Sequence, residues 1–259
     1  MVTIHPTAIV DAKAQLDSDV DVGPYAIIGP DVKIGEGTVV QAHAYVSGYT
    51  TIGKRCEIFP FACVGMKSQD LKYKAGDVTY VEVGDETVLR EFSTLHLGTK
   101  PGEVTRVGSR CLIMAYCHIA HGCAVGNDVI MSNLATLAGE VTIEDFAIIG
   151  GMAGIHQFCR IGTHAMIGGA TKIRQDCPPF MVVDIAGSEI RVLGPNIVGL
   201  QRRGFSSEVR AALKEAYKLI YREGLNRTQA LERIKYEVPD LPEVKTLVDF
   251  YHNSTRGVH

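Results

Sequence analysis

The sequence contains few aromatic residues and none of the largest kind. Aromatic side chains make up 7% of its 259 residues and Trp is absent, so the interior must be built mainly from aliphatic side chains. The formal net charge of -3 gives no concentrated basic surface of the kind that nucleic acids and anionic membranes attract. We therefore expect a globular protein with no nucleic-acid partner.

Two kinds of segment are also missing. No stretch approaches the roughly 18 consecutive apolar residues that identify a membrane-spanning helix. The first residues, Met1 to Pro6, lack the basic start and apolar run of a secretory signal peptide. We therefore expect a cytoplasmic protein without a transmembrane segment. The seven cysteines include no Cys-x-x-Cys pair, so they predict neither a structural zinc site nor a redox motif, and we expect no cofactor.

What the sequence does contain is a repeat of six residues. Leu, Ile, Val or Met occupies every sixth position from Ile4 to Val64, and again from Val107 to Ile173. This period is neither helical nor that of an alternating strand, and it is typical of a parallel β-helix. Gly often follows the aliphatic residue, and we expect it at corners, where it adopts a positive φ without steric cost.

Small residues recur four positions after the aliphatic one. They include five cysteines, which we expect to be buried and reduced: Cys56, Cys111, Cys117, Cys123 and Cys159. The pattern resembles the left-handed β-helix of the hexapeptide-repeat acyltransferases, in which three hexapeptides form one triangular coil. The resemblance implies a mainly β domain over residues 1–186.

The period breaks twice, and then it ends. Residues near 66–82 and near 98–106 are expected to form loops, and loops on a rigid scaffold are favoured places for binding. After Pro179 helical periodicity begins, so we expect a small C-terminal α-helical domain over residues 187–259. Its helices are predicted to begin at Ser206 or Ser207, at Asn226 with Gln229, and at Pro242.

Four imidazoles stand out as candidates for chemistry. His118 and His121 lie three residues apart on either side of the inward-pointing Ile119, while His96 and His156 each follow an interior aliphatic residue. For any one of them, a surface or corner His with a local hydrogen bond is the simpler interpretation. Together they favour a site, because an imidazole that titrates near neutrality suits general-base catalysis.

Longer motifs make the resemblance closer. The chain is similar to the UDP-N-acetylglucosamine acyltransferases through five runs, namely Gln69–Tyr73, His118–His121, Leu134–Gly139, His156–Cys159 and Arg202–Ser206. The resemblance implies transfer of a 3-hydroxyacyl group from acyl carrier protein to the 3-position of UDP-N-acetylglucosamine, the first step of lipid A biosynthesis. It also implies a homotrimer whose active sites lie between subunits.

The same resemblance implies roles for individual residues. His121 matches the general base, and the backbone N–H of Gly139 matches the oxyanion donor. Gly169 matches a position near the end of the acyl groove, where side-chain size would set chain length. The other matched positions line the substrate cleft or, for the last three, the nucleotide end: Asp70, Lys72, His96, His118, His156, Gln157, Asn196, Arg202 and Arg203.

The chain departs from this family at three positions. Gly122 stands where an Asp usually follows the base, Glu140 where a His usually follows the oxyanion Gly, and Val198 where a Glu is expected near the uridine. Because residues 18 apart stack in successive coils about 4.8 Å apart, we hypothesise that Glu140 replaces the carboxylate missing at position 122. The change is also compatible with a substrate whose 3-position carries an amine, since some members of the family acylate such an analogue.

Other functions remain open, because a β-helix does not determine function. A zinc hydratase on the same prism would use three imidazoles from neighbouring subunits, and His96, His118, His121 and His156 supply enough of them. A later N-acyltransferase of the same pathway would carry a distinct N-terminal domain, whereas these hexapeptides begin at Ile4. A purely structural or binding role for the repeat is the last alternative.

Overall fold

The computed structural model describes all residues 1–259, and most of them form a prism of short parallel strands. The first sheet contains β1 (Thr3–Ile4), β4 (Asp21–Val22), β7 (Val39–Val40), β10 (Glu57–Ile58), β13 (Val88–Leu89), β16 (Leu112–Ile113), β19 (Ile130–Met131), β22 (Ile148–Ile149), β25 (Met166–Ile167), β27 (Met181–Ala186) and β28 (Glu189–Pro195). The second contains β2 (Ile9–Val10), β5 (Ile27–Ile28), β8 (Tyr45–Val46), β11 (Cys63–Met66), β14 (Thr94–His96), β17 (His118–Ile119), β20 (Thr136–Leu137), β23 (Gly154–Ile155) and β26 (Lys172–Ile173). The third contains β3 (Gln15–Leu16), β6 (Val32–Ile34), β9 (Tyr49–Ile52), β12 (Tyr80–Val83), β15 (Val104–Val107), β18 (Ala124–Val125), β21 (Thr142–Ile143) and β24 (Arg160–Ile161).

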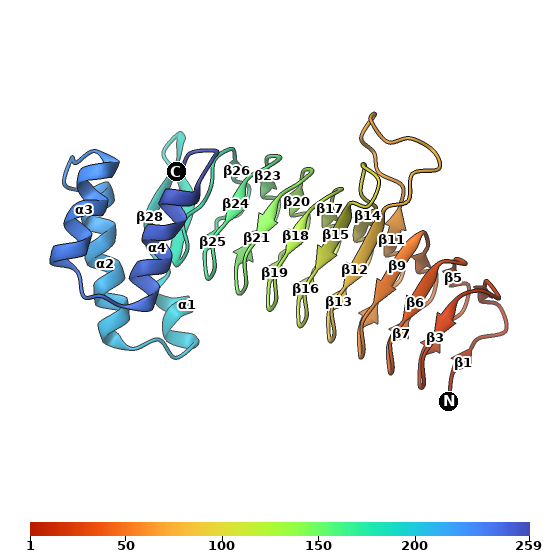
Figure 1. The fold of residues 1–259 in the computed structure, drawn as a ribbon. Helices are drawn as coiled ribbons and strands as arrows, with labels where there is room; N and C mark the ends of the chain where they lie inside the picture. The colour runs from red at the N-terminus through yellow and green to blue at the C-terminus, as the bar shows by residue number, and fades with distance from the viewer.

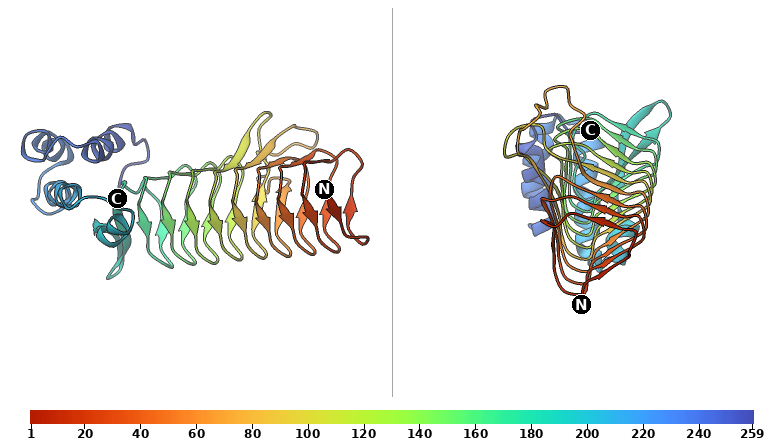
Figure 2. Two further views of the ribbon diagram at one scale, coloured as in Figure 1. Left: turned by 90° about the horizontal axis from the view of Figure 1, so that it is seen from below. Right: turned by 90° about the vertical axis from the view of Figure 1, so that its right-hand side faces the viewer.

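From β1 to β24 each coil contributes one strand to each sheet, and Figure 2 shows the resulting triangular cross-section end on. The predicted left-handed β-helix is therefore confirmed. We call the turn from the first to the second sheet the first corner, that from the second to the third the second corner, and that from the third back to the first the third corner. Corner residues 18 apart, such as Gly122 and Glu140, lie above one another in successive coils.

The aliphatic series forms the core, as its period predicts. From Val22 onward its members are buried, whereas Ile4 is 46% exposed because no coil covers the N-terminal end of the prism. The five predicted interior cysteines are buried and unpaired. Burial raises the pKa of Cys111 to about 11 and that of Cys123 to about 12, so these thiols stay protonated at neutral pH.

The expected reason for the glycines after the aliphatic residue is wrong. The corners with positive φ are formed mostly by other residues, for example Tyr116 at 62° and Phe146 at 64°. Gly35 instead lies against the next coil, where an added Cβ would come within 2.8 Å of the carbonyl carbon of Gly53. Close stacking of neighbouring coils, and not a left-handed backbone, requires Gly there.

Two loops project from one edge of the prism, and they lie side by side (Figure 1). Residues 67–79 join β11 to β12, and residues 97–103 join β14 to β15. Ser68 Oγ and Thr99 Oγ1 are hydrogen bonded at 2.6 Å, and Gly102 N–H donates to the Val78 carbonyl at 2.8 Å. The predicted breaks are therefore loops, and they hold each other in place.

The C-terminal region contains α1 (Ile197–Arg202), α2 (Ser207–Tyr221), α3 (Arg227–Glu237) and α4 (Pro242–Asn253), at one end of the prism. Ser206 caps α2 and Asn226 forms a capping box with Gln229, as predicted. The sequence does not predict α1, and the predicted helical domain of residues 187–259 includes residues 189–195. They form β28 instead, which pairs antiparallel with β27 and covers the free edge of the first sheet.

The end of the chain returns to the prism. Asp176 is buried, and its carboxylate accepts hydrogen bonds from Arg160 N–H and from the Ser254 hydroxyl. The Asp176 backbone also exchanges hydrogen bonds with Gly257 and His259. This contact fixes the helices against the last coils. None of the helices is both long enough and apolar enough to cross a membrane.

Candidate active site

His121 lies at the second corner, just after β17. Ile119 is fully buried, so the strand directs its neighbours outward and His121 reaches the edge of the prism below the two loops. Its side chain is 17% exposed. A Cβ added at Gly139, one coil further on, would overlap the Nε2 atom of this imidazole. The ring therefore lies directly over the Gly139 backbone, and only Gly leaves room for it.

The Gly139 N–H is available for a ligand. Gly139 lies between β20 and β21, and its carbonyl accepts from Phe158 N–H, but its own N–H donates to no other group of the chain. A free backbone donor beside a neutral imidazole nitrogen can bind an oxyanion while the imidazole accepts a proton. The two predicted residues are thus brought together in a geometry suited to acyl transfer.

Two further imidazoles lie on the second sheet beside this corner. The rings of His96 and His118 meet edge to face at 4.8 Å, and His118 Nδ1 is hydrogen bonded to Thr94 Oγ1 at 2.7 Å. Burial lowers the pKa of His96 to about 4, with smaller contributions from His118 and His121, and burial also lowers the pKa of His118. Both are neutral at physiological pH and can donate or accept a hydrogen bond without carrying charge.

The loop of residues 67–79 brings Asp70 to the same place. Its Oδ2 lies 3.5 Å from His121 Nε2, while its Oδ1 accepts from Lys72 N–H at 2.9 Å. Ser68 Oγ accepts the Asp70 N–H at 3.1 Å, so the position of the carboxylate is defined by its own loop. Lys72 is exposed beside it.

Glu140 stacks on position 122, but it has a partner of its own. Its Oε1 lies 3.0 Å from Lys100 Nζ in the second loop. A different carboxylate faces the imidazole, because Glu103 Oε2 lies 3.6 Å from His121 Nδ1. The sequence does not single out Glu103 or Lys100, although both belong to the segment that breaks the hexapeptide period.

His156 and Gln157 occupy the next coil along the same edge, and both are exposed. His156 Nδ1 lies 3.2 Å from the guanidinium of Arg256, which the C-terminal segment places there. His121, Gly139 and Gln157 therefore occupy the second corner in three successive coils. Arg256 is a third residue that the sequence does not single out, since nothing in the sequence indicates that the chain end returns to the prism.

The remaining predicted residues lie elsewhere on the single chain. Gly169 is at the first corner, next to Ala170 with its φ of 56°. Asn196 caps α1, and its Nδ2 donates to the His164 carbonyl at 3.2 Å. Arg203 lies over the Phe146 ring at 4.3 Å, at the third corner, and Arg202 is exposed beside it. The predicted set thus covers all three corners.

One group of side chains has the spacing of metal ligands. Glu103, His121 and Glu140 each offer one ligand atom within 4.8 Å of the others. Lys100, however, forms ion pairs with both glutamates, at 3.0 Å to Glu140 and 3.9 Å to Glu103, and its ammonium competes with a metal cation for them. We therefore interpret the group as an acid–base cluster.

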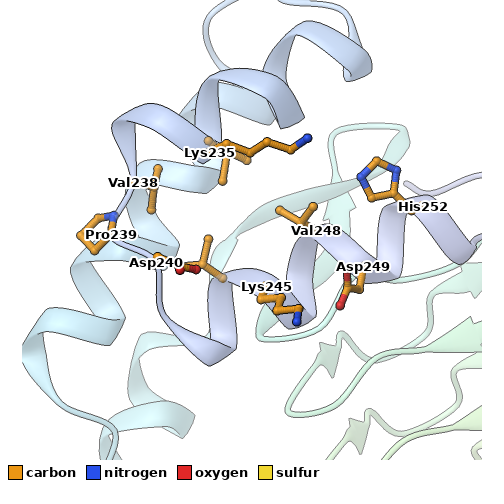
Figure 3. A pocket seen from close by; sticks show the side chains of 10 residues that line it. Lys235, Val238, Pro239, Asp240, Lys245, Val248, Asp249 and His252 are labelled. Carbon is orange, nitrogen blue, oxygen red and sulfur yellow. The ribbon is translucent and has the colours of Figure 1, made fainter.

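A separate hollow lies between α3 and α4 in the helical domain (Figure 3). Its lining mixes apolar side chains such as Val238 and Val248 with charges of both signs, including Lys235 and Asp249. None of the predicted site residues lines this hollow. The edge around His121 is the better candidate.

Comparisons with known proteins show which family the chain resembles. A family model for the second domain of UDP-N-acetylglucosamine O-acyltransferases matches residues 176–259, and one for bacterial transferase hexapeptide repeats matches residues 13–48 and 105–139. The chain is 38% identical to the UDP-N-acetylglucosamine acyltransferase of Francisella novicida, with a TM-score of 0.94 over 100% of this chain and 93% of that one. It is 40% identical to the O-acyltransferase of Moraxella catarrhalis, with a TM-score of 0.92 and 98% of each chain covered. The acyltransferase of Arabidopsis is 34% identical, with a TM-score of 0.87 over 98% of this chain and 99% of that one.

Proposed function

Because this chain belongs to the UDP-N-acetylglucosamine acyltransferase family, we propose a specific acyl transfer for it. It is an acyltransferase, and the donor we propose is a 3-hydroxyacyl group on acyl carrier protein. The acceptor is the 3-hydroxyl of UDP-N-acetylglucosamine, so the reaction begins lipid A biosynthesis. The observation that carries this proposal is the imidazole of His121 lying over Gly139, whose N–H has no acceptor in the chain.

The chemistry follows from these two groups. His121 Nε2 takes the proton of the sugar hydroxyl as its oxygen attacks the thioester carbonyl, and the Gly139 N–H donates to the oxyanion that develops there. The new C–O bond forms, the C–S bond breaks, and the imidazolium returns its proton to the sulfur of the carrier. His96 and His118, both neutral, are suited to orient the sugar, and Asp70 and Lys72 to bind its polar groups.

The distribution of the site over three corners supports a homotrimer with active sites between subunits. In one chain, Gly169 lies at the first corner and His121 at the second. One cleft can therefore contain both residues only if they come from two neighbouring copies of the chain. The first corner also carries a ladder of stacked rings, Tyr25, His43, Phe61, Phe92 and Tyr116, with centroids 4.8 to 5.1 Å apart. The four Tyr and Phe rings are between 41% and 57% exposed, which is unusual for an unpartnered surface. An acyl chain between this corner and a neighbour's second corner would pass Gly169.

The nucleotide end of the cleft is proposed at α1. Arg202 and Arg203 lie at the end of this helix, and guanidinium groups suit a diphosphate because they offer several fixed charged donors. Asn196 holds the start of α1 through its hydrogen bond with Gly199 N–H at 3.1 Å. Its Nδ2 donates to the His164 carbonyl, so we infer that Asn196 positions α1 and with it the two arginines, and does not itself bind the nucleotide.

A second candidate acceptor is the 3-amino analogue of the sugar, which would give an amide. The observation that favours it is the number of carboxylates around His121: Asp70, Glu103 and Glu140, against one ammonium, that of Lys100. A negative environment favours an ammonium group in the ground state, and His121 would then be needed to release the free amine.

One experiment tests both candidates. The purified protein is incubated with a panel of 3-hydroxyacyl carrier proteins and with each UDP-sugar, and products are identified by mass. We expect an ester with UDP-N-acetylglucosamine; an amide product alone would transfer the proposal to the amine, and no acylated product with either sugar would overturn it. The variant His121→Gln is the control, with a rate at least about 100-fold lower and an unchanged oligomeric mass expected if His121 is the base.

A further inference from the structure

The buried nitrogen of His121 faces one group that can receive its proton. Nδ1 is buried and has no hydrogen-bond partner at standard length, and the nearest carboxylate oxygen is Glu103 Oε2 at 3.6 Å. The other charged or titratable groups around the ring are Asp70 at Nε2, Glu140 and Lys100 beside the loop, and His96 and His118 on the second sheet. Catalytic hydrogen bonds are often long in the absence of substrate and shorten when it binds.

Glu140 is less suited to this role than Glu103. Its carboxylate is neutralised by Lys100 Nζ at 3.0 Å and its side chain is 30% exposed, against 16% for Glu103. Lys100 is more distant from Glu103, at 3.9 Å. A less screened and less solvated carboxylate acts more strongly on a neighbouring imidazole.

The loop holds the Glu103 carboxylate in place. Thr99 N–H donates to Glu103 Oε2 at 2.5 Å, and Glu103 N–H closes the turn by donating to the Lys100 carbonyl at 2.9 Å. The hydroxyl of Thr99 is in turn bonded to Ser68, so the loop that carries Asp70 supports the loop that carries Glu103. A carboxylate fixed by its own backbone loses little further entropy when it binds an N–H group.

The glycine at position 122 leaves the space that Glu103 uses. Gly122 has a φ of 66°, and a Cβ there would lie 3.1 Å from Glu103 Cδ and 3.0 Å from Glu140 Cγ. A side chain at 122 would thus compete with Glu103 for one place beside the imidazole. In this chain the carboxylate nearest to Nδ1 of the imidazole therefore comes from the loop and not from position 122.

We propose that Glu103 is the positioning residue for His121. Its carboxylate accepts the Nδ1–H, which leaves the lone pair on Nε2 toward Gly139 and the acceptor, and it stabilises the imidazolium that forms during transfer. The inference rests on the proposed role of His121 as base, and it replaces Glu140 in the hypothesis drawn from the sequence.

The test compares three glutamate variants of the full-length protein. Glu103→Gln should lower kcat by about 10- to 100-fold with little change in KM, and should move the acidic limb of the kcat/KM profile to lower pH, because the imidazole loses its anionic neighbour. Glu140→Gln should change the rate and profile less, and Glu189→Gln, an exposed hairpin residue that is paired with Arg191, is the matched control. A larger shift for Glu140→Gln, or an unchanged profile for Glu103→Gln, overturns the proposal.

A rescue variant separates positioning from structural damage. In the background Glu103→Ala, the second change Gly122→Asp should restore much of the lost kcat, because Asp tolerates the left-handed backbone, as Asp128 does here with a φ of 55°. Unfolding temperature and oligomeric mass are recorded for each variant. If the double variant folds normally and its rate is no higher than that of Glu103→Ala, a carboxylate at position 122 does not replace that of Glu103, and the positioning role is wrong.

Histidine NMR distinguishes this inference from the proposed function. With ¹³C-labelled histidine, the His121 signal is assigned by its loss in His121→Gln, and its titration is followed without any turnover. We expect Glu103→Gln to move this titration to lower pH. If the titration does not move and His121→Gln is still inactive, the positioning role of Glu103 is wrong while His121 remains the proposed base. If the titration moves and His121→Gln is fully active, the role of His121 as the base is wrong.

Discussion

The interior of the prism and its second corner differ in what fixes each residue. Leu137 is fully buried in a column of similar side chains, with Ile119 below it and Ile155 above. Gly139, two residues further on, faces the imidazole of His121 and has an N–H without an acceptor. The first position is determined by its coil, and the second by the imidazole that lies over it.

Stability and chemistry are assigned to different residues in this fold. Interior positions repeat with every coil, so each one contributes to the core in the same way. The loops of residues 67–79 and 97–103 occur once, and they supply two of the three carboxylates around His121, those of Asp70 and Glu103. Substitutions in the two regions should therefore move different measurements.

The largest expected effect is on stability, from Leu137→Ala. Removing a fully buried Leu leaves a cavity between coils that cannot collapse, and should lower the free energy of unfolding by about 2–5 kcal/mol. Chemical denaturation measures this loss, and turnover per folded active site should stay close to normal. If Leu137→Ala keeps the free energy of unfolding of the unmodified protein but has lost its activity, stability and chemistry are not assigned to different residues.

Gly139→Ala should lower the activity and leave the stability nearly unchanged. Its added Cβ overlaps the His121 ring, so the imidazole must turn away from the oxyanion donor, and kcat should fall by about 100-fold or more. Gly139 has no positive φ, so Ala is compatible with the backbone and the unfolding midpoint should change little. The matched control is Gly154→Ala, because a Cβ at that position meets nothing within 4 Å. Equal losses of activity in the two variants would refute the steric explanation.

Much of the prism could be predicted from the sequence because its period reports directly on the interior. A residue such as Ile143 is aliphatic because it meets Val125 below and Ile161 above it in the third sheet, and every coil imposes the same requirement. Cys123 follows the same rule at the small interior position. The N-terminal end shows the limit, since Ile4 keeps the period and is nevertheless exposed.

The candidate site could be predicted only in part, because two loops that fold over a corner leave no periodic pattern in the sequence. Motifs indicate His121 and Gly139, whereas the stacking of coils, the one spatial rule that the repeat offers, indicates Glu140 and not Glu103. That rule holds, as Glu140 does lie against position 122. It says nothing about a loop that folds over the same corner, nor about Lys100, which neutralises Glu140 there.

The smallest expected effect comes from the contact between the loops. Ser68→Ala removes the hydrogen bond to Thr99 Oγ1 and the one that Ser68 Oγ accepts from Asp70 N–H, so both carboxylate-bearing loops lose support. We expect kcat/KM to fall by about three- to tenfold, in keeping with about 1 kcal/mol for a hydrogen bond. The unfolding midpoint should change less than in Leu137→Ala, because the core is untouched. Ser188→Ala, in the exposed turn between β27 and β28, is the control. A fall in stability as large as that of Leu137→Ala would mean that the loops belong to the cooperative core, and the distinction between the two regions would fail.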